Sequence, residues 1–132
     1  PPLSQDEAAA TTRDALTRTA AALSDPGNPA DLSGVLTDGE LDSYEAQADE
    51  FASTGVHQNG APTIENPGIV SDDGATVSVQ ACVDSSSVHV LDDQGTDLHA
   101  SQPKRSLTIF MLTNSNGSWK ISGESFPDDP TC

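Results

Sequence analysis

The spacing of apolar residues changes once along the chain, near residue 56, and this change constrains the fold most strongly. Before it, apolar or small residues recur every three or four positions, as in amphipathic helices. After it, they alternate with polar residues, as in half-buried strands. Helices followed by a meandering antiparallel sheet define the α+β class, with the helices packed on one face of the sheet. The chain of 132 residues is long enough for one such domain.

Residues 1–27 are expected to hold a leading helix and a linker. Ser4-Gln5-Asp6-Glu7 has the form of a capping box, in which Ser4 and Glu7 each satisfy a backbone amide of the other. A stripe rich in alanine follows, and Asp25-Pro26-Gly27 is expected to end the helix. The stripe consists of Ala8, Thr12, Ala15, Leu16, Thr19, Ala20 and Leu23.

Residues 28–56 are expected to hold two further helices. Asn28-Pro29 favours the start of a short helix, with Pro29 in its first turn. Thr37-Asp38-Gly39-Glu40 is a second capping-box sequence, and the helix after it is expected to end near Thr54-Gly55. The apolar residues are Leu32, Val35 and Leu36 in the first of these helices and Leu41, Tyr44, Ala48 and Phe51 in the second.

Residues 57–132 are expected to form the antiparallel sheet and a C-terminal tail. Residues 76–83 alternate valine or alanine with polar residues, which predicts a half-buried strand. Residues 106–113 carry apolar side chains on both faces, which indicates a central strand covered on both sides. Residues 114–117, Asn-Ser-Asn-Gly, predict a hairpin loop that leads into a return strand containing Trp119 and Ile121.

The charge balance excludes some classes of partner. The chain has 21 acidic against 5 basic residues, a formal net charge of −16, whereas binding to a nucleic acid backbone needs clustered lysine and arginine. No stretch approaches the roughly 18 apolar residues of a membrane span. An acidic surface keeps a secreted protein soluble and repels anionic partners, and adaptation to a saline habitat is an alternative explanation for it.

The two cysteines, Cys82 and Cys132, bear on the compartment. In a reducing cytosol they would remain thiols, whereas outside it such a pair commonly forms a disulfide. A bridge would pin the end of the chain to a central strand, and closing a loop of about 50 residues is worth about 4 kcal/mol in the chain-entropy model. The chain starts with Pro1-Pro2 and has no apolar leader, so we expect that a targeting segment has been removed.

Several segments, taken in their order, resemble secreted or lipoprotein members of the NTF2-like (cystatin-like, cone-shaped) superfamily from actinobacteria. They are the strand 75–84 with its Cys-x-Asp sequence, the turn 93–95, the strand 106–112, the Gly-x-Trp hairpin at 116–121 and the terminal Cys132. The resemblance covers roughly residues 35–132. It implies a single domain over residues 1–132, with N-terminal helices packed on a curved antiparallel sheet, and a late cysteine, Cys132, that pairs back to Cys82.

The resemblance also implies a pocket between sheet and helices, where enzymes of this fold place an aspartate base and a tyrosine, histidine or second acid. Candidate cavity residues are Tyr44, Asp84 and His89, and His57 and His99 are also available. No pair has a diagnostic spacing. Asp84 is more typical of a strand end, His89 of a surface or rim position and Tyr44 of a helix core, so no residue is assigned a catalytic role.

No metal or other cofactor is expected. The three histidines lack the short ligand spacing of zinc-binding helices. Residues 92–97, Asp-Asp-Gln-Gly-Thr-Asp, resemble a calcium loop faintly, but they lack its alternating acids and its distant glutamate. A solvated turn is the simpler interpretation.

These features favour a noncatalytic extracytoplasmic module, secreted or anchored to the cell surface by a lipid. It would act through protein contacts at the cell envelope or by modest ligand binding. A small cavity enzyme or carrier of the isomerase or cyclase type is one alternative, and it requires an apolar pocket holding a carboxyl or histidine of shifted pKa. An assembly domain of a secretion or conjugation channel is another, and it would expose an apolar patch.

Overall fold

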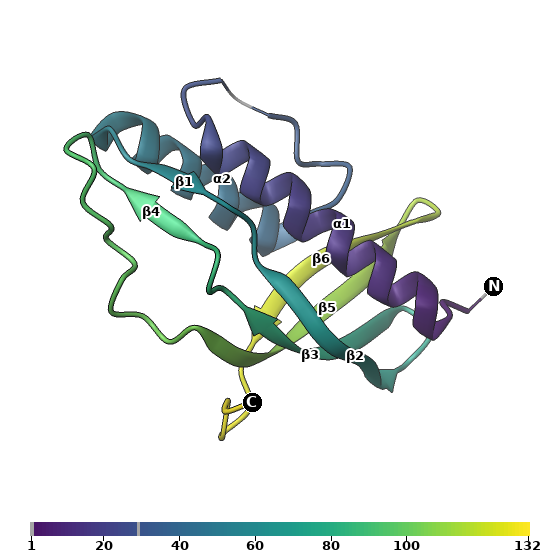
Figure 1. Cartoon of the computed structure of the whole chain (residues 1–132). Helices are drawn as coiled ribbons and strands as arrows, with labels where there is room; N and C mark the ends of the chain where they lie inside the picture. The colour runs from purple at the N-terminus through teal and green to yellow at the C-terminus, as the bar shows by residue number, and fades with distance from the viewer. Residues whose placement is uncertain (1, 29) are drawn as a thin grey trace.

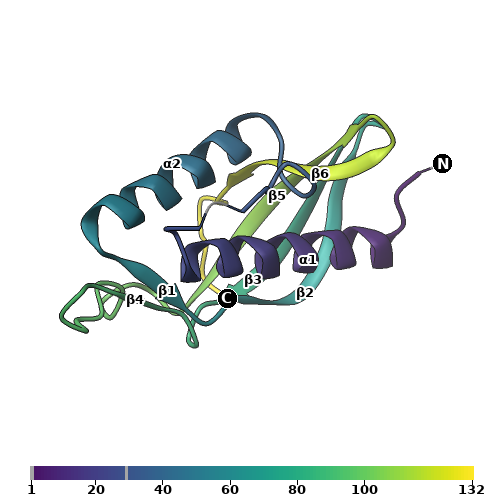
Figure 2. The ribbon, with the colours of Figure 1, turned by 90° about the horizontal axis from the view of Figure 1, so that it is seen from above.

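The computed structural model describes residues 2–28 and 30–132, which form two helices followed by six strands (Figure 1). Both helices lie on the same side of the main sheet in Figures 1 and 2. The fold is therefore α+β, with N-terminal helices packed on an antiparallel sheet, and this prediction is confirmed. The elements are α1 (Gln5–Ser24), α2 (Asp38–Thr54), β1 (His57–Asn59), β2 (Thr63–Asp72), β3 (Thr76–Asp84), β4 (His89–Leu91), β5 (Arg105–Ser115) and β6 (Ser118–Ser125).

The main sheet has the strand order β2-β3-β5-β6, and all its neighbours are antiparallel. A separate two-stranded sheet pairs β1 with β4. The two strands with the clearest sequence patterns, β3 and β5, lie in the centre of the main sheet. The residue pairs Val77–Leu112 and Val79–Phe110 lie directly opposite each other across them.

The core lies between the helices and one face of the main sheet. Because side chains alternate along a strand, every second residue of β3 and β5 points toward the helices, and six of these inward-facing residues are almost completely buried. The outer face of β5 carries apolar residues that are only half-buried, so the expected covering of this strand on both sides is complete on the helix side and only partial on the other. The buried residues are Val77, Val79 and Ala81 of β3 and Thr108, Phe110 and Leu112 of β5.

Helix α1 begins with the capping box expected from its sequence. The Glu7 amide donates to Ser4 Oγ at 3.1 Å, and the Ser4 amide donates to Glu7 Oε1 at 3.1 Å. The alanine-rich stripe of α1 faces the core, where Ala8 and Ala15 are each 1% exposed. Small side chains on this stripe let the helix approach the sheet closely.

The prediction of a short helix after Asn28 is wrong. Residues 30–36 make a single turn, and the chain then runs beside β6, where the Ile121 amide donates to the Val35 carbonyl and the Thr37 amide donates to the Ile121 carbonyl, both at 2.9 Å. Backbone groups that a helix would have used are thus bonded to a strand. The apolar residues named for this segment are nevertheless buried, and Pro29 lies outside the described residues.

The prediction of a second capping box is also wrong, although the position of the helix that follows it, α2, was predicted correctly. Thr37 is the N-cap of α2, but its side chain makes no capping bond. Glu40 does not reach back to the cap and is instead 8% exposed at the core. The helix ends at Gly55 with φ 72°, the left-handed conformation that glycine adopts without strain.

The C-terminal tail returns to the main sheet. Its Pro130 carbonyl accepts a bond from the Leu107 amide of β5 at 2.7 Å. A disulfide then joins Cys132 to Cys82 of β3, with their Cα atoms 6.0 Å apart and a sequence separation of 50. The tail is therefore attached to the sheet by a covalent bond as well as a hydrogen bond.

Candidate functional site

An open pocket of about 400 Å³ lies between the helices and the inner face of the main sheet. Its volume falls within the range of roughly 300–1,000 Å³ that is typical of small-molecule sites. Its apolar wall combines residues from α1, β3, β5 and three connecting segments. These residues are Leu16, Pro62, Val83, Pro103, Phe110 and Phe126.

Polar side chains reach the same pocket from several directions. Tyr44 comes from α2, Glu124 from β6, and His99 from the segment between β4 and β5; the smaller polar residues are Ser85, Gln102, Ser106 and Thr108. Among the described residues that line the pocket, none is lysine or arginine. The pocket is thus mostly apolar, with a carboxyl, a phenol and an imidazole available to contact a ligand.

Glu124 faces the pocket because β6 contains a bulge. The pairing of β6 with β5 skips Ser122, which is an extra residue between Ile121 and Gly123. Residues three apart in a regular strand point to opposite faces. The extra residue cancels one alternation, so Ile121 and Glu124 both face the helices. A hydrogen bond of 2.8 Å between the hydroxyls of Ser122 and Thr113 supports the bulge.

Glu124 lies near Glu40 of α2, and the two carboxyl groups affect each other's protonation. Burial, reinforced by the neighbouring charge of Glu124, raises the pKa of Glu40 to about 8. Burial also raises the pKa of Glu124, although its exposed surface opens onto the pocket. Two carboxyl groups so close in a poorly solvated site do not both ionise readily, so the pair retains a proton at neutral pH.

Tyr44 belongs to the same cluster. It follows Glu40 by one helical turn on α2, so both side chains lie on the same face of the helix. Burial raises the pKa of the Tyr44 phenol, and the charges of Glu124 and Glu40 raise it further. Of the three candidate cavity residues named from the sequence, Tyr44 is the one that lines the pocket.

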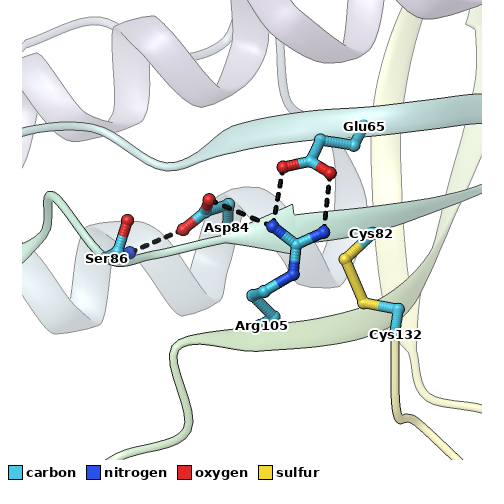
Figure 3. A network of polar contacts seen from close by, with 6 residues as sticks. All are labelled: Glu65, Cys82, Asp84, Ser86, Arg105 and Cys132. Carbon is cyan, nitrogen blue, oxygen red and sulfur yellow. Dashed lines mark hydrogen bonds and ion pairs between the residues drawn. A yellow bond between two sulfur atoms is a disulfide. The ribbon is translucent and has the colours of Figure 1, made fainter.

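Asp84 lies on the opposite face of the main sheet, because it follows pocket-lining Val83 by one residue in β3. There the Arg105 guanidinium contacts Glu65 through two bonds of 2.6 and 2.8 Å and Asp84 through one of 3.3 Å (Figure 3). The Ser86 amide and hydroxyl, and then Arg105, lower the pKa of Asp84. An ionised, paired carboxylate outside the pocket has a structural role, so the expectation that Asp84 is a cavity residue is corrected.

His89 also lies outside the pocket. Its Nδ1 is 2.9 Å from Asp97 Oδ2 in an exposed pair on β4, and the hydrogen bond from His89 is the main cause that lowers the pKa of Asp97 to about 2. This pair fixes the loop after β4 and corrects the expectation for His89. His57 is half-buried on β1. His99, which the sequence offered without preference, is the histidine that reaches the pocket.

The described ranges contain no cluster of three or more histidine, cysteine or acidic residues arranged to hold a metal ion. In the loop expected to form a solvated turn, Asp92 Oδ1 accepts bonds from the Gln94 and Thr96 amides, both at 2.9 Å. That carboxylate oxygen therefore serves the turn itself. Neither helix of the described chain is long and apolar enough to cross a membrane.

The pair of Glu40 and Glu124 could not be found from sequence spacing. Glu40 stands in a capping-box motif, which assigns its carboxylate to the helix end. Glu124 reaches the pocket through a bulge that the pattern of apolar residues does not reveal. The register between β5 and β6 turns Glu124 toward the helices, and the packing of α2 on β6 brings Glu40 to it.

Comparisons with known proteins bear on the fold. No family model and no curated protein matches the sequence. The intermembrane space region of the chloroplast protein ARC6 is similar in structure, with a TM-score of 0.67 at 16% identity over 99% of this chain and 100% of that one. Aln2 from a Streptomyces species has a TM-score of 0.55 at 17% identity over 98% of this chain and 94% of that one. These likenesses show the fold alone, two N-terminal helices packed on an antiparallel sheet, which is the arrangement that the resemblance in sequence implied.

Proposed function

We propose that this protein is a noncatalytic extracytoplasmic module that holds a small, largely apolar molecule in the pocket between its helices and its sheet. The observation that carries the proposal is the pocket itself, about 400 Å³ in volume and lined by apolar side chains with a few polar groups. Ligand sites typically have this combination, in which apolar walls supply affinity and a few polar groups fix orientation. Tyr44 and Glu124 are the polar groups proposed to contact the ligand.

The compartment is proposed from the disulfide. A bond between Cys82 and Cys132 persists in an oxidising environment and is rare in a reducing cytosol. The strongly acidic surface suits a chain that must stay soluble and avoid anionic surfaces outside the cell. We therefore place the module at the cell envelope, secreted or held by a lipid anchor, where protein partners would receive or deliver its ligand.

The pocket is tested with a neutral apolar dye whose fluorescence rises in an apolar site, N-phenyl-1-naphthylamine. Ser106 of β5 lines the pocket, and Ser106→Trp should fill it and abolish the fluorescence gain. Ser78 of β3 is paired with Met111 on the outer face, so Ser78→Trp is the matched control and should bind the dye like the wild type. Thermal melting checks that both variants fold. A wild type that does not bind the dye, or equal binding by both variants, would overturn the proposal.

The alternative of a small cavity enzyme has one observation in its favour. The acid pair beside the pocket, with its raised pKa values, is the kind of group that general acid–base catalysis uses. Compounds found to bind should therefore be incubated with the protein and followed by mass spectrometry. An unchanged compound supports the noncatalytic module, whereas conversion that is lost in Glu124→Gln would establish the enzyme.

The assembly-domain alternative lacks a comparable observation. The exposed large apolar side chains of the described chain come from three separate segments, at Val70 of β2, Leu98 before β5 and Phe126 after β6. Phe126 already belongs to the pocket wall.

A further inference from the structure

The aromatic residues of this chain are concentrated at the pocket. The chain contains one tryptophan, one tyrosine and three phenylalanines, and Tyr44, Phe110 and Phe126 all line the pocket. Aromatic faces attract organic cations as well as apolar groups, because the ring quadrupole is negative above its plane. Such a concentration in a chain so poor in aromatics points to the chemistry of the ligand.

The charges around the pocket favour a cation. Glu124 lines it, and Glu40 is close enough to Glu124 to interact with its charge. No lysine, arginine or histidine within residues 2–28 and 30–132 makes an ion pair with either carboxyl group. Two neighbouring acids without a protein cation leave the site short of one positive charge, which a ligand can supply.

We propose that the ligand is an organic amine, whose apolar part fills the pocket and whose ammonium group lies against Glu124, with the ring of Tyr44 beside it. This inference rests on the proposed function, since it names the ligand class of the same pocket. The formal charge of −16 would also attract a cation to the molecule over a distance.

Binding of the ammonium should be linked to protons. Near pH 7 the pair of Glu40 and Glu124 retains a proton, and an adjacent ammonium favours the ionised form of both carboxyls, so this proton leaves to the buffer as the ligand binds. Tyr44 stays protonated throughout, because its pKa is raised. His99 is the other titratable group at the pocket. Affinity for the amine should therefore increase from pH 5 to pH 8.

The test uses three naphthalene ligands of matched shape: 2-(1-naphthyl)ethylamine, 2-(1-naphthyl)ethanol and 3-(1-naphthyl)propanoate. Isothermal calorimetry should show that the amine binds at least tenfold more tightly than the alcohol and that the carboxylate binds least. Calorimetry of the amine in two buffers of different ionisation enthalpy should show proton release. Glu124→Gln should lower affinity for the amine about tenfold, consistent with the loss of one charged contact, and leave affinity for the alcohol unchanged.

Controls separate this inference from the proposed function. Glu50→Gln changes an exposed acid on α2, the helix that carries Glu40. This variant should bind the amine like the wild type. If Glu124→Gln does not fold, Glu40→Gln takes its place, and the comparison of amine with alcohol needs no variant. Equal affinity for amine and alcohol would overturn the inference that the ligand is an amine, and it would still be consistent with the proposed ligand-binding function. Failure to bind any naphthalene ligand and the neutral dye would overturn both.

Discussion

At the scale of single residues, the inner face of β5 holds the helices to the sheet. Leu112 is 0% exposed and Phe110 is 1% exposed, and both belong to the core cluster. Met111 lies between them in sequence but points to the outer face, where it is only half-buried. Neighbouring residues of one strand thus differ widely in the apolar surface that they bury.

Leu112→Ala should lower the free energy of unfolding by about 2–5 kcal/mol, the range for removing a fully buried leucine side chain and leaving a cavity. Met111→Ala, its neighbour on the outer face, should cost clearly less, because that side chain is already partly in water. Urea unfolding followed by circular dichroism gives both values. Equal losses in the two variants would show that the outer face is packed as tightly as the core.

Arg105 is the residue that organises the outer face. It pairs with both Glu65 and Asp84, and its bonds to Glu65 are the main cause that lowers the pKa of that carboxyl. Carboxylates with lowered pKa values contribute stability above their unfolded-state pKa values, and this contribution disappears as the pH falls through the folded-state values. The pairs are exposed to solvent, so their contribution is modest and is screened by salt.

Arg105→Gln should therefore melt below the wild type at pH 7 and low salt, and the gap should narrow in 1 M NaCl and at pH 3. Differential scanning calorimetry measures both trends. Arg18→Gln is the matched control, since Arg18 pairs with Asp14 within α1 and bridges no strands, and its effect should be smaller. A gap that salt does not change would indicate that Arg105 acts through packing of its aliphatic stem.

At the scale of elements, two capping-box sequences of the same form precede α1 and α2, but only the first makes the capping hydrogen bonds. The capping box at Ser4 formed because α1 begins in solvent, where Glu7 is free to reach the helix end. The same motif at Thr37 did not form, because the chain before α2 is bonded to β6 and Glu40 faces the interior. Strand patterns predicted β3 and β5 correctly, since alternation reflects the burial of one face. Patterns of this kind do not encode pairing between elements distant in sequence.

The candidate site divides in the same way. Tyr44 could be predicted, because an aromatic residue on the apolar stripe of a helix points toward the sheet. Asp84 and His89 could not be placed, since a shift of one residue along a strand moves a side chain to the other face. Glu124 depended on the extra residue in β6. The position of Glu124 at the pocket therefore could not be predicted without the pairing register of β5 and β6.

Glu40→Gln tests the acid pair between α2 and β6. An acid with a raised folded-state pKa contributes stability below its unfolded value of 4.5, and this stability is lost as the pH rises through about 8. The variant should therefore unfold at higher urea concentration than the wild type at pH 9, and the difference should vanish or reverse at pH 5.

Glu50→Gln provides the comparison, because it removes one negative charge from the exposed side of α2 and leaves the pair intact. Its stability should follow the wild type across the pH range, apart from a small constant offset. Parallel profiles for all three proteins would contradict the existence of a proton shared between Glu40 and Glu124.

At the scale of the whole molecule, an acidic chain with few large apolar residues keeps an open pocket between its helices and its sheet. The acidic residues behind the formal charge of −16 repel one another in the compact state, which lowers stability. A pocket of about 400 Å³ lowers stability further, because its walls lack the packing contacts of a filled core. The disulfide offsets these costs, because it ties the last residue to a central strand and restricts the unfolded chain.

Cys132→Ala should show the size of this contribution. Opening the loop closed by this disulfide removes at most about 4 kcal/mol in the chain-entropy model. For a domain of this size, that loss lowers Tm by at most roughly 15 °C. Thr131→Ala, in the same tail, should melt like the wild type. Dithiothreitol should lower the Tm of the wild type to that of Cys132→Ala and leave the Tm of the variant unchanged. A wild-type Tm that does not change with the reductant would show that the tail is held by noncovalent contacts, such as the bond between Leu107 and Pro130.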